Sequence, residues 1–211
     1  MTATQFCFVR HGETSWNAER RLQGHLDIPL NEKGKKQASL TAWGLSAHRF
    51  DRIYSSDLLR TRETAQHASE ALGVAIQVQP ALRERHFGLF QGMTYQEAEQ
   101  KHPEAYRRFH GRDEHYTPPE GGESLLSLSL RVKHCLETIA RQHPGEKVLI
   151  VTHGGVLDVV HRLATGKDLA SPRDFTIPNA ALNWLEWQNG HWAMLEWADQ
   201  SHLDQNGLDE L

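Results

Sequence analysis

The sequence contains little cysteine: there are two, Cys7 and Cys135, and they form no CxxC pair. Both stand in apolar patterns and are predicted to be small buried residues, which excludes a disulfide-rich scaffold. The first five residues lack the basic and apolar regions of a signal peptide. Together these features favour a reducing compartment, and we expect a cytoplasmic protein.

Several other features are missing from the sequence. No apolar stretch approaches the ~20 residues of a membrane span, so no membrane partner is expected. The net charge is −4 without a long basic run, which disfavours nucleic acid as a partner. There is no GxxxxGK phosphate loop, which disfavours a nucleoside triphosphatase of that type. A negative protein can still bind an anion where its cations converge in one cleft.

The composition is that of an ordinary globular protein, with 38% hydrophobic and 24% charged residues in a chain of 211. We expect one domain over 1–211, with an irregular excursion at about 85–123 that covers the site. Alternating strand and helix patterns predict the α/β class: a three-layer sandwich with a mainly parallel central sheet and helices on both faces.

The expected elements follow from apolar periodicity and capping residues. Asn31 and Ser124 are predicted helix caps, and Asn189-Gly190 predicts a tight antiparallel hairpin at the edge of the sheet. Strands are expected at about 5–9, 50–54, 75–78, 147–152, 181–187 and 191–197, and helices at about 32–46, 58–72, 94–102, 124–142 and 154–165. The polar tail from 199 to 211 is expected either to be mobile or to fold over the site.

Two of the predicted strands end in the same dipeptide, His11-Gly12 and His153-Gly154. Ligands of α/β proteins bind past the carboxyl edge of the sheet, so these loops are expected to converge there. Arg10 and Arg60 add guanidinium groups and Glu84 adds a carboxylate. Phosphoryl transfer needs such a mixture: a nucleophile, cations for the equatorial oxygens and a proton donor for the leaving oxygen.

In five ordered blocks the chain resembles the histidine phosphatase superfamily, which includes cofactor-dependent phosphoglycerate mutases. The blocks cover nearly the whole chain, so the resemblance is specific even though Arg-His-Gly alone is a weak signal. The matching stretches are Val9–Thr14 with Trp16-Asn17, Ser55–Thr61, Leu82–Glu84 with Phe87-Gly88, Gly121–Ser124 and Val151–Gly155.

The resemblance implies a role for each residue that matches the family pattern. His11 would become a phosphohistidine, Glu84 would act as proton donor and then as base, and His153 would hold phosphoryl oxygens. Arg10 and Arg60 would bind the same oxygens, and the positions matching substrate contacts are Asn17, Gln23, Gly24 and Gly154. No metal and no cofactor are expected, because guanidinium groups supply the positive charge.

Three functions are compatible with these residues. The preferred reading is a phosphomonoesterase acting on a small phosphorylated metabolite, and the alternative is a phosphoglycerate mutase that uses the same intermediate. The short stretch from Phe87 to Gly121 disfavours the mutase, and the intact set of His11, Glu84 and His153 disfavours an inactive phosphate-binding scaffold. A homodimer is possible. Arg62 and Glu13 are interpreted as structural.

Overall fold

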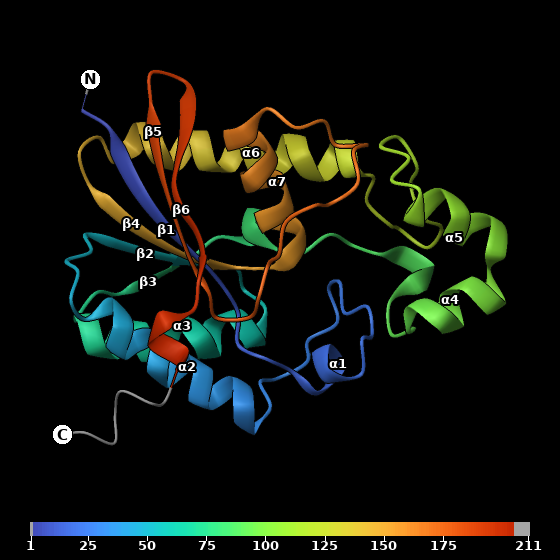
Figure 1. The fold of residues 1–211 in the computed structure, drawn as a ribbon, viewed down its shortest axis with the longest axis horizontal. Helices are drawn as coiled ribbons and strands as arrows, with labels where there is room; N and C mark the ends of the chain where they lie inside the picture. The colour runs from blue at the N-terminus through green and yellow to red at the C-terminus, as the bar shows by residue number, and fades with distance from the viewer. Residues whose placement is uncertain (1, 205–211) are drawn as a thin grey trace.

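The computed structural model describes residues 2–204 and is built around a six-stranded sheet of order β3-β2-β4-β1-β5-β6 (Figure 1). The parallel strands β3, β2, β4 and β1 make up one side, and the antiparallel strands β5 and β6 form the other edge. The strands are β1 Thr4–Arg10, β2 Arg52–Ser55, β3 Ile76–Val78, β4 Lys147–Thr152, β5 Leu182–Gln188 and β6 His191–Asp199. The predicted α/β sandwich with a mainly parallel sheet is confirmed.

Strand β1 lies at the centre of the sheet because both of its faces are apolar. Phe6 and Phe8 point to the core on one face, while Cys7 and Val9 point to the core on the other, and all four are fully buried. Hydrogen bonding to β4 and to β5 fixes the register on both sides. The polar residues that follow Val9 are therefore held at the carboxyl edge of the sheet.

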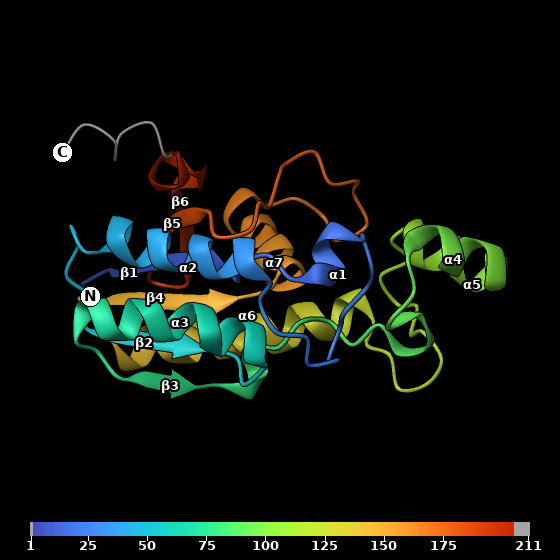
Figure 2. The same ribbon diagram turned by 90° about the horizontal axis from the view of Figure 1, so that it is seen from below.

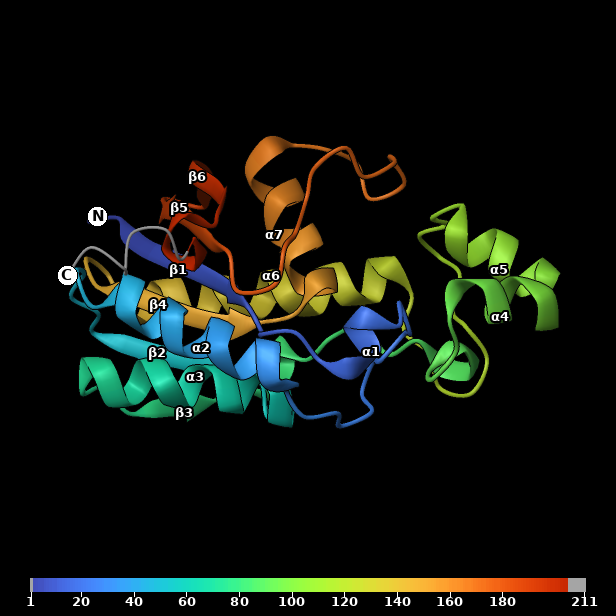
Figure 3. The same ribbon diagram turned by 60° about the horizontal axis from the view of Figure 1, so that its bottom comes forward.

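Helices cover both faces of the sheet, as Figures 2 and 3 show. Helices α2 Glu32–Leu45 and α3 Leu59–Leu72 pack on one face, and α6 Leu125–Gln142 and α7 Gly154–Thr165 pack on the other. The predicted caps are confirmed, because the side chains of Asn31 and Ser124 accept hydrogen bonds from Gly34 N and Ser127 N. The short helices are α1 Ser15–Ala18 and the 3-10 turns Pro80–Leu82, Gly88–Phe90 and Ser201–Leu203.

The predicted edge hairpin is confirmed as β5 and β6. Asn189 and Gly190 have φ angles of 52° and 85°, the left-handed conformation that a tight turn of this kind requires. The ring of Trp192 packs at a tilt against Phe6 and Phe8, with ring centroids 5.3 and 6.3 Å away. The hairpin thus helps to cover the sheet.

The excursion at 85–123 contains two helices where the sequence predicted one. The expected helix is α4 Tyr95–Lys101, and a second helix, α5 Pro103–His110, follows it directly. His102 leaves the helical conformation with φ −137°, and Pro103 then starts a new helix at a position where proline is tolerated. A small core of its own, formed by Leu22, Phe90, Ala98 and Tyr116, supports the excursion.

The described end of the chain packs on α2. His202 is buried there, with Nε2 lying 3.0 Å from the Ala180 carbonyl oxygen and 3.3 Å from Thr41 Oγ1. The tail predicted to be mobile or to fold over the site spans 199–211, and its residues 205–211 lie outside the described residues. No helix within residues 2–204 is long and apolar enough to cross a membrane.

Candidate active site

A cavity of about 560 Å³ opens at the carboxyl edge of the sheet. It is lined by residues of the loop that follows β1, of the first turns of α3 and α7, and of the excursion. The predicted site residues among its lining are Arg10, His11, Asn17, Gln23, Gly24, Arg60, Glu84 and Gly154. The remaining one, His153, lies beside His11 with its ring centroid 5.3 Å away. The structure thus brings together every residue predicted for the site.

His11 is buried and uses one ring nitrogen in a local hydrogen bond. Its Nδ1 lies 2.8 Å from the Gly12 carbonyl oxygen, which can only accept, so Nδ1 carries the proton. Burial, together with the charges of Arg60 and Arg10, holds the pKa of His11 well below its usual range. The imidazole is therefore neutral near pH 7, and Nε2 carries a free lone pair.

His153 uses the opposite ring nitrogen. Its Nε2 lies 2.7 Å from Ser56 Oγ, which in turn lies 2.7 Å from Thr61 Oγ1. Thr61 donates its own proton to the Leu58 carbonyl, so Ser56 can donate to Thr61 and accept from His153. Nδ1 of His153 is buried and has no hydrogen-bond partner among the described residues. Burial, Arg60, His11 and Arg10 lower the pKa of His153 as well.

Arg60 and Arg10 each keep a buried Nε without a partner among residues 2–204. Arg60 is fully buried in the first turn of α3, and its terminal nitrogens donate to the carbonyls of Leu26 and Gly24. Burial lowers the pKa of Arg60 to about 10, so the group remains charged at pH 7. Arg10 donates through Nη1 to the Ile177 carbonyl. An anion next to His11 would satisfy both unpaired donors.

Arg62 and Glu13 behave as structural residues, as the sequence analysis interpreted them. Arg62 is exposed on α3, whereas Arg60 two positions earlier is completely buried. Glu13 accepts from Asn31 Nδ2 at 3.0 Å and pairs with Lys33 Nζ at 2.8 Å. Neither Arg62 nor Glu13 is part of the cavity lining.

Glu84 reaches the cavity from the turn that follows the 3-10 helix Pro80–Leu82. Its carboxylate accepts a hydrogen bond from the Gly155 N–H, at 3.1 and 3.0 Å to its two oxygens, and another from the Arg85 N–H at 2.7 Å. A Cβ atom at position 155 would lie 2.1 Å from Glu84 Oε1. The second glycine after His153 thus makes room for this carboxylate and fixes it through its backbone.

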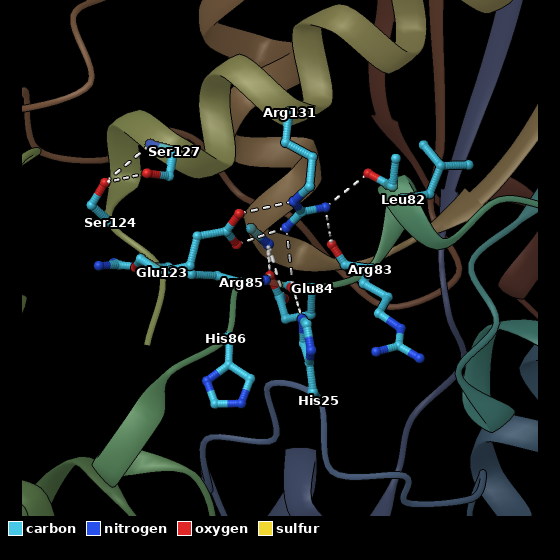
Figure 4. Close-up of polar contacts among 12 residues, drawn as sticks. His25, Leu82, Arg83, Glu84, Arg85, His86, Glu123, Ser124, Ser127 and Arg131 are labelled. Atoms are coloured by element: carbon cyan, nitrogen blue, oxygen red, sulfur yellow. Dashed lines mark hydrogen bonds and ion pairs between the residues drawn. The ribbon is translucent and has the colours of Figure 1, made fainter. Parts of the chain in front are cut away.

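The backbone around Glu84 is held by side chains from two distant elements (Figure 4). Arg131 of α6 donates to the carbonyls of Ala81, Arg83 and Glu84, and its guanidinium also pairs with both carboxylate oxygens of Glu123 at 2.8 and 2.7 Å. On the other side, His25 Nε2 lies 2.8 Å from the Glu84 carbonyl oxygen. These contacts fix the turn from which Glu84 projects.

The remaining predicted site residues line the cavity in different ways. Asn17 uses its side-chain oxygen to accept from the Thr14 N–H at 3.0 Å, which caps α1. Gln23 is buried, and its Oε1 has no partner among the described residues. The Gly24 carbonyl accepts a hydrogen bond from Arg60. Gly154 is the first residue of α7 and lies beside Arg10. Gln23 is therefore the one of these four with an unpaired buried polar atom.

Several residues that hold the site together were not predicted from the sequence. Asn179 Nδ2 donates to the His11 carbonyl at 2.8 Å, Ser56 binds His153, and Arg131 anchors Glu84. Ser56 lies in the matching stretch Ser55–Thr61 just after a predicted strand, so the sequence could have indicated a role for it at the site. For Asn179 and Arg131 no sequence pattern indicates such a role, because their hydrogen-bond partners lie 168 and about 50 residues away. Within residues 2–204 no group of three or more His, Cys, Asp or Glu residues is placed to hold a metal ion.

Comparison with known proteins was made for both sequence and fold. The chain is 42% identical over 203 residues to phosphoglycerate mutase-like protein 4 of Arabidopsis thaliana, covering 95% of this chain and 87% of that protein. It is 39% identical over 207 residues to the metal-independent phosphoserine phosphatase of the same plant, covering 97% and 85%. Among solved structures, YhfR of Bacillus stearothermophilus matches with a TM-score of 0.87 and 33% identity, over 95% of this chain and all of that one.

The family model described as histidine phosphatase superfamily (branch 1) matches residues 6–200, which include His11, Arg60, Glu84 and His153. The resemblance noted in the sequence thus extends over nearly the whole chain and is matched by the fold. This protein belongs to the histidine phosphatase superfamily, branch 1.

Proposed function

We propose that the protein is a metal-independent phosphomonoesterase that hydrolyses a small phosphorylated metabolite through a phosphohistidine at His11. The observation that carries this proposal is the set of unpaired buried nitrogens beside the neutral His11: Arg10 Nε, Arg60 Nε and His153 Nδ1. Buried polar atoms are rarely left unpaired without a functional reason. A phosphoryl group bound at His11 would pair with all three, and its negative charge would favour protonation of His153.

In the first step, His11 Nε2 attacks phosphorus and the bond to the ester oxygen breaks. Glu84 gives its proton to that oxygen, so the product leaves as an alcohol. Arg10, Arg60 and protonated His153 stabilise the negative charge of the transferring group. Nδ1 of His11 keeps its hydrogen bond to the Gly12 carbonyl, which orients the ring while Nε2 becomes bonded to phosphorus.

In the second step, water attacks the phosphohistidine while Glu84, now a carboxylate, accepts a proton from it. The phosphorus–nitrogen bond breaks, inorganic phosphate leaves, and His11 returns to its neutral form with Nε2 free. Splitting one difficult displacement into two easier steps is the advantage of covalent catalysis. Two backbone N–H groups, from Gly155 and Arg85, hold the Glu84 side chain in place beside the cavity.

A phosphoglycerate mutase is the alternative, because one relative is named as mutase-like and the other as a phosphatase. Both activities would use the same phosphohistidine, and they differ in the acceptor of the phosphoryl group. The phosphatase is favoured by the short stretch between Phe87 and Gly121, as argued from the sequence. Assaying inorganic phosphate and 2-phosphoglycerate in parallel, with 3-phosphoglycerate as substrate, separates the two.

The experiment that tests the proposal is trapping of the intermediate. Enzyme incubated with a labelled phosphomonoester and quenched in alkali should carry acid-labile label on His11, and His11→Ala should carry none. Activity should survive incubation with EDTA. Label on a serine or an aspartate, or activity that is lost to EDTA and restored by a divalent metal, would contradict the mechanism. A cytoplasmic location, a homodimer, one domain over 1–211, and the absence of nucleic-acid or membrane partners stay predictions.

A further inference from the structure

The cavity contains far more positive charge than binding one phosphoryl group requires. Within the described residues, the carboxylates of its lining are Glu84 and Asp158, while its lining includes the arginines Arg10, Arg20, Arg21, Arg60, Arg85, Arg112 and Arg173. Arg21 is paired with Glu19 and Glu97 outside this set. The excess charge indicates a ligand with negative charge beyond the transferring phosphoryl group.

Part of the excess is concentrated around Asp158 on α7. This buried carboxylate accepts from three guanidinium groups: Arg112 at 2.7 Å, Arg162 at 3.0 Å and Arg173 at 2.9 Å. The other nitrogens of Arg112 and Arg162 donate to backbone carbonyls, including those of Leu169 and Ser171. One carboxylate therefore balances three cations, and two of the three are further fixed by carbonyls.

Arg173 differs from the other two arginines of this cluster. It binds Asp158 through Nε and is 43% exposed, compared with 17% for Arg112 and 2% for Arg162. Its two terminal nitrogens have no hydrogen-bond partner among residues 2–204 and belong to a side chain that lines the cavity. Asp158 thus holds the Arg173 side chain through Nε and leaves the two terminal nitrogens free to bind a ligand.

Arg173 lines the same cavity as Arg10, His11 and Glu84. Burial lowers the pKa of Arg10, the charge of Glu84 opposes this, and the charge of Arg173 adds to the lowering. The cavity that Arg10 and Arg173 share has a volume of about 560 Å³, which is in the size range of small-molecule sites.

We propose that Arg173, held by Asp158, binds a carboxylate of the substrate, so that the preferred substrates are phosphomonoesters of small hydroxy acids. The inference rests on the proposed function and specifies its substrate class. One guanidinium with two free donors matches one carboxylate with two acceptor oxygens, in the bidentate geometry that arginine favours. A second phosphate would bring about two negative charges to this one guanidinium group.

The test compares two pairs of substrates that differ in the carboxylate: 3-phosphoglycerate with glycerol 3-phosphate, and phosphoserine with phosphoethanolamine. For the wild-type enzyme we expect kcat/KM, measured by phosphate release, to be about tenfold or more higher for the carboxylated member of each pair. Arg173→Gln should reduce this ratio to near one, and Arg173→Lys should keep part of it. Two arginines remain on Asp158 in these variants, so the buried carboxylate stays paired.

Arg107→Gln is the matched control, because Arg107 is exposed on α5 and outside the cavity lining. It should keep the wild-type ratio. A wild-type ratio near one, or an Arg173→Gln variant that loses the same factor on both members of a pair, would overturn the inference.

Direct binding separates this inference from the proposed function. Calorimetry with His11→Ala measures binding of 3-phosphoglycerate and glycerol 3-phosphate without turnover. Tighter binding of 3-phosphoglycerate that depends on Arg173 would support the carboxylate site even if no phosphomonoester were hydrolysed. Hydrolysis of p-nitrophenyl phosphate with equal binding of the two ligands would support the phosphatase and overturn the carboxylate site.

Discussion

The two strand-end dipeptides, His11-Gly12 after β1 and His153-Gly154 after β4, look alike in sequence but are built differently. Nδ1 of His11 donates to the neighbouring Gly12 carbonyl, which leaves Nε2 free. His153 instead uses Nε2 toward Ser56, on the turn after β2, and leaves Nδ1 unpaired. Both rings are buried and lie 5.3 Å apart. The two identical residues thus leave opposite ring nitrogens without a partner among the described residues.

The glycines of the two dipeptides differ as well. A Cβ at Gly12 would lie 2.5 Å from the Gly34 carbonyl oxygen, so Gly12 permits close packing of its loop against α2. At Gly154 a Cβ would meet Arg10 Nε at 3.6 Å, an ordinary contact, and it is Gly155 whose Cβ would collide with Glu84. The first dipeptide therefore positions the proposed nucleophile, and the second positions the proposed oxygen-binding histidine together with Glu84, the proposed proton donor.

The largest expected effect comes from removing each histidine in turn. We expect His11→Ala to lower kcat/KM by about 10⁴-fold or more, because the nucleophile is lost. His153→Ala should cost about 10²–10³-fold, as for the loss of one preorganised group that stabilises charge. Single-turnover labelling should still detect slow formation of phosphohistidine at His11 in His153→Ala. Equal losses, with label absent from both variants, would show that the two histidines act as one unit.

Glu84→Gln tests whether the carboxylate beside Gly155 is the proton donor. It should slow the first step with an alkyl phosphate by about 10²–10⁴-fold. With p-nitrophenyl phosphate, whose leaving group needs no proton, that step should be nearly spared. The second step also uses Glu84, so a burst of nitrophenolate should precede slow turnover. If the first step slows equally for both substrates and no burst is seen, Glu84 only positions the substrate.

Replacing Gly155 or Gly154 with alanine tests which of these two glycines makes room for Glu84. Gly155→Ala should lower kcat/KM by about 10–10²-fold, because the new Cβ displaces the Glu84 carboxylate from its place. Gly154→Ala should cost less, because its Cβ meets Arg10 and Glu84 only at contact distance. The loss in Gly155→Ala should be greater for alkyl phosphates than for p-nitrophenyl phosphate. A loss independent of the leaving group would mean that Gly155 matters for helix α7 and not for Glu84.

The smallest effect is on stability as a function of pH. Burial and nearby arginines lower the pKa of His11 and of His153 in the folded protein, whereas an unfolded histidine has a pKa near 6.5. The unfolded chain therefore binds more protons below about pH 6.5, and stability should fall as the pH falls. Each histidine contributes up to about 1.4 kcal/mol per pH unit there.

Urea unfolding at about pH 7.5 and about pH 5.5 measures this dependence. His11→Gln and His153→Gln should each make it shallower than in the wild type. His134→Gln, on the exposed side of α6, serves as the control and should leave the slope unchanged. An unchanged slope in both site variants would indicate that neither histidine is held neutral by the fold.

Much of the fold could be predicted because it follows from local patterns. Apolar runs predicted the buried strands β1 and β4, and Asn31, Ser124 and Asn189-Gly190 predicted caps and a turn through contacts within a few residues. Helix α5 was missed because Pro103 masks the continuation of the helical pattern after α4. The carboxyl-edge positions of His11, Arg60 and His153 were also predictable, since the ends of parallel strands meet at one edge of a sheet. Glu84 follows the 3-10 helix Pro80–Leu82, and its role at the site was expected from the family resemblance.

The order of residues along the chain thus indicates which chemical groups gather at this edge. Only the folded chain shows which nitrogen of each imidazole is free, because the Gly12 carbonyl binds the His11 ring and Ser56 binds the His153 ring. It also decided that Arg60 is buried while Arg62 is exposed, and that Asp158 leaves the ends of Arg173 unpaired. Roles at this level depend on burial and on hydrogen-bond partners far away in the chain, and only the folded chain brings those together.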